Sequence, residues 1–129
     1  MSAERRTLPR YLCTDEFSNV QMQFADGEFT LMSINFHRRG IALFTEKTLP
    51  EITQAVISFS YQHNSEVIKI EQLPCLIKHR HETEVGHQYG IEFDTDQRAA
   101  PNFRARLKQI EKALSAAAHL NDRYGLDQP

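Results

Sequence analysis

The residues best suited to bind a ligand are arginines near the N-terminus. The stretch ERRTLPR, residues 4–10, carries Arg5, Arg6 and Arg10 with few apolar neighbours. Pro9 interrupts any continuous helix, so an extended or turned arm is expected. A guanidinium presents a planar fork that binds a phosphate or the O6/N7 edge of guanine, and its face can stack on a base. Taken alone, the stretch is better explained as a disordered, solvated basic terminus.

A second basic motif lies further along, in SINFHRRGI, residues 33–41. A hydrophobic strand is expected to end near Asn35, and Gly40 permits a tight turn before the next strand. The polar residues of the turn are His37, Arg38 and Arg39. Their crowding at one rim of a sheet favours a site for an anion or a nucleobase, with an incidentally charged, solvated turn as the alternative.

Motifs for catalysis or metal binding are missing from the sequence. It contains no GxSxG, P-loop or HExxH pattern. His79 and His81 would share a strand face, but Lys78 and Arg80 flank them and would repel a cation. Cys13 and Cys75 stand far apart and are expected to be reduced core thiols. We therefore expect neither an enzyme nor a metal site, and no cofactor.

The composition is that of one ordinary domain. The chain has 129 residues, of which 40% are hydrophobic and 25% charged, with a formal net charge of -2. No apolar run approaches the roughly 20 residues of a membrane span, and none follows the N-terminal arginines as in a secretory signal. A cytoplasmic protein without a membrane partner is expected. The slightly acidic charge disfavours binding to a nucleic-acid polymer.

Alternating strands are predicted from Leu12 to Phe93. NVQMQFADGEFTLMSINF reads as a hairpin turning at Asp26-Gly27, with Val20, Met22 and Phe24 on one face. The later strands are expected at 41–45 and 54–61, then after the polar turn 62–65 in EVIKIEQL, CLIKHRHETEV and HQYGIEF. Strands in unbroken succession predict an all-β fold, a small six- to seven-stranded antiparallel β-barrel.

The hydrophobic period changes after Pro101. An amphipathic helix is predicted over residues 101–120, with its apolar stripe against an open side or end of the barrel. The stripe comprises Phe103, Leu107, Ile110, Leu114 and Ala117. The expected single domain thus consists of a flexible ligand-clasping arm (1–11), the β-barrel (12–95), the helix and a tail (121–129).

The two basic motifs together resemble the PilZ family, whose domains bind the bacterial second messenger cyclic di-GMP. Family members open with RxxxR, often RRxxxR, and carry (D/N)xSxxG later, at the end of a barrel strand. Here the first motif is RRTLPR, residues 5–10, and the second is NFHRRG, residues 35–40. The segments GIALFT and GIEF and the C-terminal helix extend the likeness over nearly the whole chain. His37 stands where the family has serine, and Arg39 stands where many members have a second glycine.

The resemblance implies a cyclic di-GMP site. It assigns phosphate and guanine contacts to Arg6 and Arg10, with Arg5 as a helper, and a guanine hydrogen bond to Asn35. Gly40 would let the backbone approach the ligand. The larger imidazole of His37 would stack on a base, reshape the pocket or partly fill it. Whether Arg38 and Arg39 touch ligand or solvent stays open.

The leading hypothesis is therefore a non-enzymatic cyclic di-GMP receptor. Ligand binding would change the conformation of the N-terminal arm and signal to an unidentified downstream protein, in control of motility, biofilm or polysaccharide. The alternative is a degenerate PilZ-like domain that does not bind the nucleotide and acts as a protein interaction scaffold. Binding of single-stranded nucleic acid ranks last, because the aromatic residues fall mostly on apolar strand faces.

Overall fold

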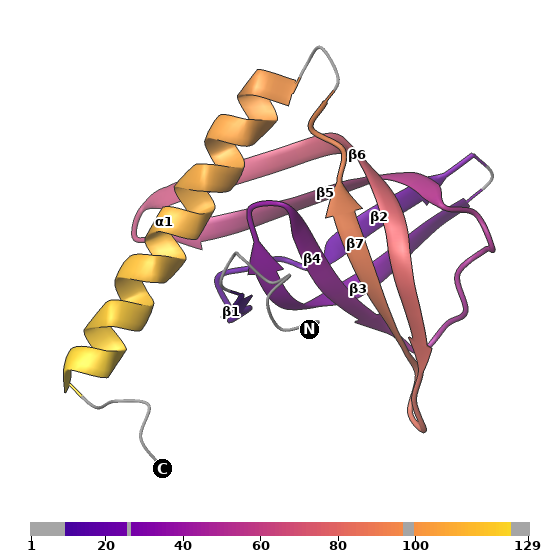
Figure 1. Cartoon of the computed structure of the whole chain (residues 1–129), viewed down its shortest axis with the longest axis horizontal. Coiled ribbons are helices and arrows are strands. Elements are labelled where there is room, and N and C mark those ends of the chain that lie inside the picture. Colours follow the sequence, from indigo (N-terminus) through magenta and orange to yellow (C-terminus); the bar gives the residue numbers. More distant parts are fainter. Residues whose placement is uncertain (1–9, 26, 97–99, 125–129) are drawn as a thin grey trace, which may run out of the picture.

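The strands and the helix form a barrel with one helix packed against it. The computed structural model describes residues 10–25, 27–96 and 100–124. Figure 1 shows the strands wrapped around a common core, with α1 running along one side. The elements are β1 (Tyr11–Leu12), β2 (Val20–Phe24), β3 (Gly27–His37), β4 (Gly40–Thr45), β5 (Gln54–His63), β6 (Glu66–Glu82), β7 (His87–Phe93) and α1 (Ala100–Tyr124).

The barrel closes through pairing between β3 and β4. The strand order is β1-β3-β2-β5-β6-β7-β4, and the additional β3–β4 pairing joins the ends into a six-stranded ring with β1 added on β3. All of these pairings are antiparallel. Closure satisfies the backbone groups that an open sheet would leave at its edges. The expected antiparallel barrel of six to seven strands with one C-terminal helix is confirmed.

The first hairpin follows the hydrophobic alternation. Val20 pairs with Leu31 and Met22 pairs with Phe29, and the alternate residues Val20, Met22 and Phe24 are buried. The hairpin expected at Asp26-Gly27 is thus confirmed, although Asp26 itself lies outside the described residues. The next two strands in sequence lie apart in the barrel, because β4 pairs with β3 and β7 whereas β5 pairs with β2 and β6.

The prediction of two strands on either side of Pro74 was wrong, since β6 runs unbroken from Glu66 to Glu82. Its register against β5 shifts between Ile57 and Phe59, and Gln72 on β6 has a positive φ of 59°. This bulge bends the strand without ending it. Pro74 lacks an N–H, but its carbonyl accepts a hydrogen bond from the Asp94 amide at 2.8 Å.

The helix α1 packs on the barrel as expected but runs further. It continues to Tyr124, so the first four residues of the expected tail are helical and residues 125–129 lie outside the described part. Leu107, Ile110 and Leu114 are buried in the barrel core. Ala117 is exposed, contrary to expectation, because the C-terminal part of the helix extends past the strands (Figure 1). Within the described ranges no helix has the length and apolarity to cross a membrane.

Both cysteines are free thiols in apolar surroundings. Cys75 is buried and Cys13 is partly buried against the core. Burial raises the pKa of Cys75 to about 12 and that of Cys13 to about 11, the latter in spite of a hydrogen bond with Ser33. Only the thiolate is strongly nucleophilic, so neither side chain is prepared for chemistry near neutral pH.

Candidate ligand-binding site

The short strand β1 attaches the end of the N-terminal arm to the barrel. Tyr11 pairs with Phe36 and Leu12 pairs with Asn35 on β3, and the Cys13 amide donates to the Ile34 carbonyl at 2.8 Å. This antiparallel register places Arg10 beside the last residues of β3, immediately before the basic turn. The sequence alone did not predict β1, which is only two residues long.

The two motifs meet through one hydrogen bond. Arg10 Nη1 donates to Asn35 Oδ1 at 3.1 Å, across a separation of 25 residues. Arg10 is exposed and Asn35 is partly buried. A guanidinium carries five N–H donors, so it can make several such contacts at once. The predicted proximity of Arg10 and Asn35 is therefore present in the structure.

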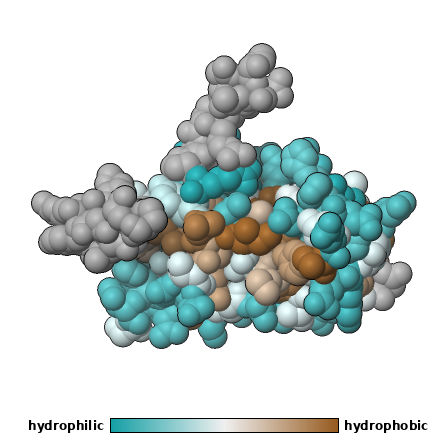
Figure 2. Space-filling model, turned by 90° about the horizontal axis from the view of Figure 1, so that it is seen from below, coloured by the Kyte–Doolittle hydropathy of each residue, from teal (hydrophilic) through white to brown (hydrophobic). Residues whose placement is uncertain are grey.

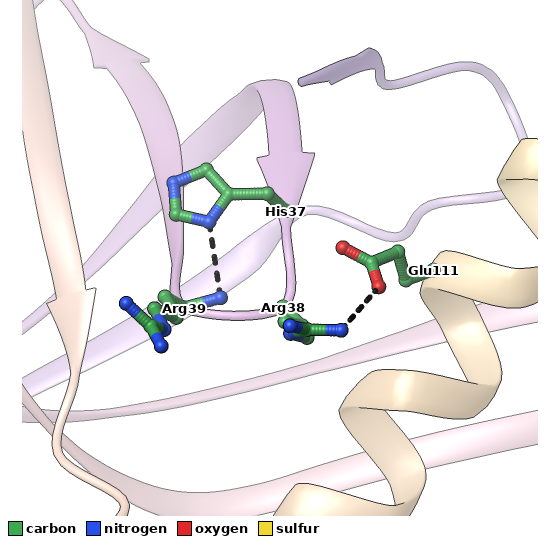
Figure 3. Close-up of polar contacts among 4 residues, drawn as sticks. All are labelled: His37, Arg38, Arg39 and Glu111. Atoms are coloured by element: carbon green, nitrogen blue, oxygen red, sulfur yellow. Dashed lines mark hydrogen bonds and ion pairs between the residues drawn. The ribbon is translucent and has the colours of Figure 1, made fainter. Parts of the chain in front are cut away.

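The turn between β3 and β4 is ordered by the side chain of His37. His37 pairs with Gly40, so Arg38 and Arg39 form the two-residue connection. His37 Nδ1 accepts a hydrogen bond from the Arg39 amide at 3.0 Å (Figure 3). A serine hydroxyl accepts a bond from the amide two residues ahead in the same way. In this local role the imidazole thus replaces a serine side chain.

Gly40 is required by the close approach of two strands. A Cβ atom at Gly40 would lie 2.3 Å from the Ile91 carbonyl oxygen on β7. The next contact along this junction is the Phe93 amide, which donates to the Arg39 carbonyl at 2.8 Å. The absence of a side chain therefore lets β4 close the barrel against β7. The structure thus gives a reason for glycine at position 40 that differs from the expected close approach of the backbone to a ligand.

A pocket of about 250 Å³ lies at this rim. Among the predicted site residues it brings together Arg10, His37, Arg39 and Gly40. Its other lining residues are Ile41, Lys78, His79, Gly90, Ile91 and Glu92. The pocket therefore combines cations from the arm, the turn and β6 with one carboxylate from β7.

Three polar residues of the pocket were not predicted as ligand contacts, namely Lys78, His79 and Glu92. Lys78 Nζ lies 3.6 Å from Glu92 Oε1, and both side chains are about half exposed. A Cβ atom at Gly90 would lie 3.1 Å from His79 Cδ2. Gly90, within HQYGIEF, was the sequence feature that could have indicated this contact with His79, because a glycine inside a strand often marks a close approach by a neighbour.

The two arginines of the turn diverge. Arg39 lines the pocket, whereas Arg38 turns toward α1, where its Nη1 lies 3.4 Å from Glu111 Oε1 (Figure 3). Glu111 is the more buried partner, with 15% of its side chain exposed against 38% for Arg38. Arg5 and Arg6 lie outside the described residues. The structure therefore joins one arginine of each motif at the pocket and directs Arg38 elsewhere.

Two other features of the barrel fit an anion or a metal ion poorly. A larger hollow of about 790 Å³ has Phe24, Glu28, Pro74 and Asp94 among its lining residues, and none of the residues lining it is basic. Its two carboxylates would repel a phosphate. His79 and His81 find no third ligand, and nowhere in the described ranges do three His, Cys, Asp or Glu side chains group as metal ligands do. Charge therefore favours the rim pocket over this larger hollow as a site for an anion.

Comparison with known proteins identifies the fold. No protein-family model and no curated protein sequence matches this chain. The inhibitor of motility MotI/DgrA from Bacillus subtilis matches with a TM-score of 0.65 at 20% identity, over 92% of this chain and 53% of its own. The PilZ domain of YcgR from Escherichia coli, solved with cyclic di-GMP, matches with a TM-score of 0.63 at 13% identity, over 97% of this chain and 99% of its own.

A third solved structure shares the architecture. PlzA from Borreliella burgdorferi, in complex with cyclic di-GMP, matches with a TM-score of 0.56 at 10% identity, over 99% of this chain and 56% of its own. This chain thus spans about half the length of MotI/DgrA and of PlzA. The three matches establish the PilZ fold for the barrel and its helix.

Proposed function

We propose that this chain of PilZ fold is a receptor for cyclic di-GMP and catalyses no reaction. The observation that carries the proposal is the 3.1 Å hydrogen bond between Arg10 and Asn35. It unites the RxxxR motif with the second motif beside a pocket that contains His37, Arg39 and Gly40. Two proteins of the same fold have been solved with this nucleotide, YcgR and PlzA.

The proposed contacts follow from the chemistry of the side chains. Arg10, with Arg6 and Arg5 preceding it, binds phosphate or the O6/N7 edge of guanine. Asn35 hydrogen-bonds a guanine edge once Arg10 shifts toward the ligand. Arg39 and Lys78 add positive potential at the pocket. The imidazole of His37 offers a flat surface on which a base can stack.

The proposed signal is a change in the N-terminal arm, which closes over the bound nucleotide. The arm connects to β1, where Leu12 is 75% exposed. One face of the molecule also carries apolar side chains at its centre (Figure 2). Exposed apolar area of this kind suits a protein interface. An unidentified partner protein would read the rearranged surface, with motility, biofilm or polysaccharide as the process controlled.

The second candidate is a scaffold that has lost the ligand. It is favoured by the hydrogen bonds that already engage Asn35 Oδ1 and His37 Nδ1 within the protein. In that case the two bonds serve only to fix the turn and β1. At the pocket Arg10, Arg39 and Lys78 outnumber the single carboxylate of Glu92. This excess of positive charge argues for the receptor instead, because a bound anion would offset it.

Calorimetry distinguishes these candidates. Titration of the protein with cyclic di-GMP is expected to give saturable heat, and titration with GMP under the same conditions is expected to give much less, since one base and one phosphate satisfy fewer groups. The absence of heat with cyclic di-GMP, together with unchanged NMR resonances of Arg10 and Asn35, would establish the scaffold in place of the receptor.

A further inference from the structure

A second basic hollow lies on the other side of the β3–β4 turn. It measures about 250 Å³ and lies between the turn, the segment after β7 and α1. The lining residues are Arg38, Arg39, Thr95, Arg104 and Lys108. Four of these five carry a positive charge, whereas the whole chain has a formal net charge of -2. The cluster is therefore local and does not reflect a generally basic protein.

Two of the arginines are held in place by neighbouring groups. Glu111, on α1, lies 3.4 Å from the Arg38 guanidinium (Figure 3) and holds this side chain, which lines the hollow. Arg104 donates to the Thr95 carbonyl and lies 4.0 Å from an oxygen of Asp96. Asp96 is 98% exposed, so water and salt screen that pair strongly. Both guanidiniums are therefore held in position. The charge of Arg104 is only weakly neutralised by Asp96.

The other two cations lack such partners. Within residues 10–25, 27–96 and 100–124, the Arg39 guanidinium and the Lys108 ammonium have no hydrogen bond or ion pair. Arg104 and Lys108 are four residues apart, so they project from the same side of the helix. Cations converging on one hollow repel each other unless an anion occupies it. Glu111 is paired with Arg38, and the exposed Asp96 lies 4.0 Å from Arg104, so the hollow keeps an excess of positive charge that a bound anion would offset.

We propose that this hollow is a binding site for a phosphate dianion, either free phosphate or a phosphate monoester. Guanidinium forks bind phosphate oxygens in pairs, and the lysine adds a point charge. The Thr95 hydroxyl supplies a further donor. No aromatic residue lines the hollow, so it selects a phosphate group and not a base.

The site is tested by NMR with inorganic phosphate as the probe. Sodium phosphate replaces sodium chloride at constant ionic strength, and the amide resonances of Thr95 and Lys108 are followed. The parent protein is expected to show saturating shifts. The double variant R104Q/K108Q is expected to bind at least about tenfold more weakly, because two charge-assisted contacts are lost. Phenyl phosphate in a parallel titration separates a monoester site from one that accepts only free phosphate.

Lys47→Gln is the control for the loss of positive charge away from the hollow. It removes one positive charge beyond Thr45, at the end of β4 opposite to the turn. About 20 Å of strand therefore separates Lys47 from the turn. Phosphate binding by this variant should equal that of the parent protein. The proposal is wrong if the shifts rise linearly without saturation, or if R104Q/K108Q and the parent saturate alike. This inference does not rest on cyclic di-GMP, and its test uses a different ligand, so either proposal can fail alone.

Discussion

Replacing Arg10 by alanine is expected to weaken cyclic di-GMP binding by about 10- to 150-fold. The range corresponds to the roughly 1.5 to 3 kcal/mol of a hydrogen bond to a charged group. Arg10 belongs to the first motif and is hydrogen-bonded to Asn35 of the second motif. Its side chain is exposed, so the thermal unfolding midpoint should change little. Isothermal titration calorimetry measures the affinity for cyclic di-GMP, and differential scanning calorimetry measures the unfolding midpoint.

Arg106→Ala is the control for this change. Arg106 is also exposed, and its Nη1 donates to the Lys69 carbonyl at 3.1 Å, outside both basic pockets. The variant removes the same charge and a comparable contact, so it corrects for the overall electrostatic effect. Equal affinities of the two variants for cyclic di-GMP would show that Arg10 makes no specific contact, and the proposed role of Arg10 would have to be abandoned.

Gly40→Ala is expected to destabilise the barrel strongly. The new methyl group would lie 2.3 Å from the Ile91 carbonyl oxygen, which is backbone and has little freedom to retreat. Forcing an extra carbon into a packed site costs about 1 to 3 kcal/mol of unfolding free energy. The strands must separate where β4 joins β7, so the rim pocket would change shape as well. Urea denaturation measures the loss.

Gly27→Ala provides the comparison for that measurement. A Cβ atom at Gly27 would meet only Phe29 Cε1, at an ordinary contact distance of 3.8 Å. The same chemical change should therefore leave the unfolding free energy nearly unaltered. If both variants unfold at the same urea concentration, the contact between Gly40 and Ile91 does not limit the closure of the barrel.

Much of the barrel could be predicted from local patterns. Strict alternation in Val20, Met22 and Phe24 gave the inner face of β2, and this face is buried. The predicted break between two strands at Pro74 does not occur, because pairing with β5 and β7 on both sides of β6 outweighs the missing N–H of the proline. The strand β1 was not predicted, because its two residues form no alternating pattern by themselves and depend on pairing with β3 for their conformation.

The candidate site was only partly predictable, for a topological reason. The nearness of Arg10 to Asn35 was expected from the two motifs and is present. Lys78 and Glu92 reach the pocket because β6, β7 and β4 are neighbours in the closed barrel, which spacing along the chain does not reveal. The direction of Arg38 depends on Glu111, and thus on how α1 packs against the barrel.

We propose that the arm and the turn together form a single cyclic di-GMP site. NMR titration of the unmodified protein with cyclic di-GMP tests this most directly, by following the Arg10 Nε–H, the Asn35 side-chain amide and the backbone amide of Gly40. If the arm and the turn form one site, all three signals shift together and saturate with one dissociation constant, while the Lys47 amide beyond the far end of β4 stays unchanged. Unchanged Arg10 and Asn35 signals at saturating nucleotide, or shifts confined to the hollow around Glu28 and Asp94, would contradict it.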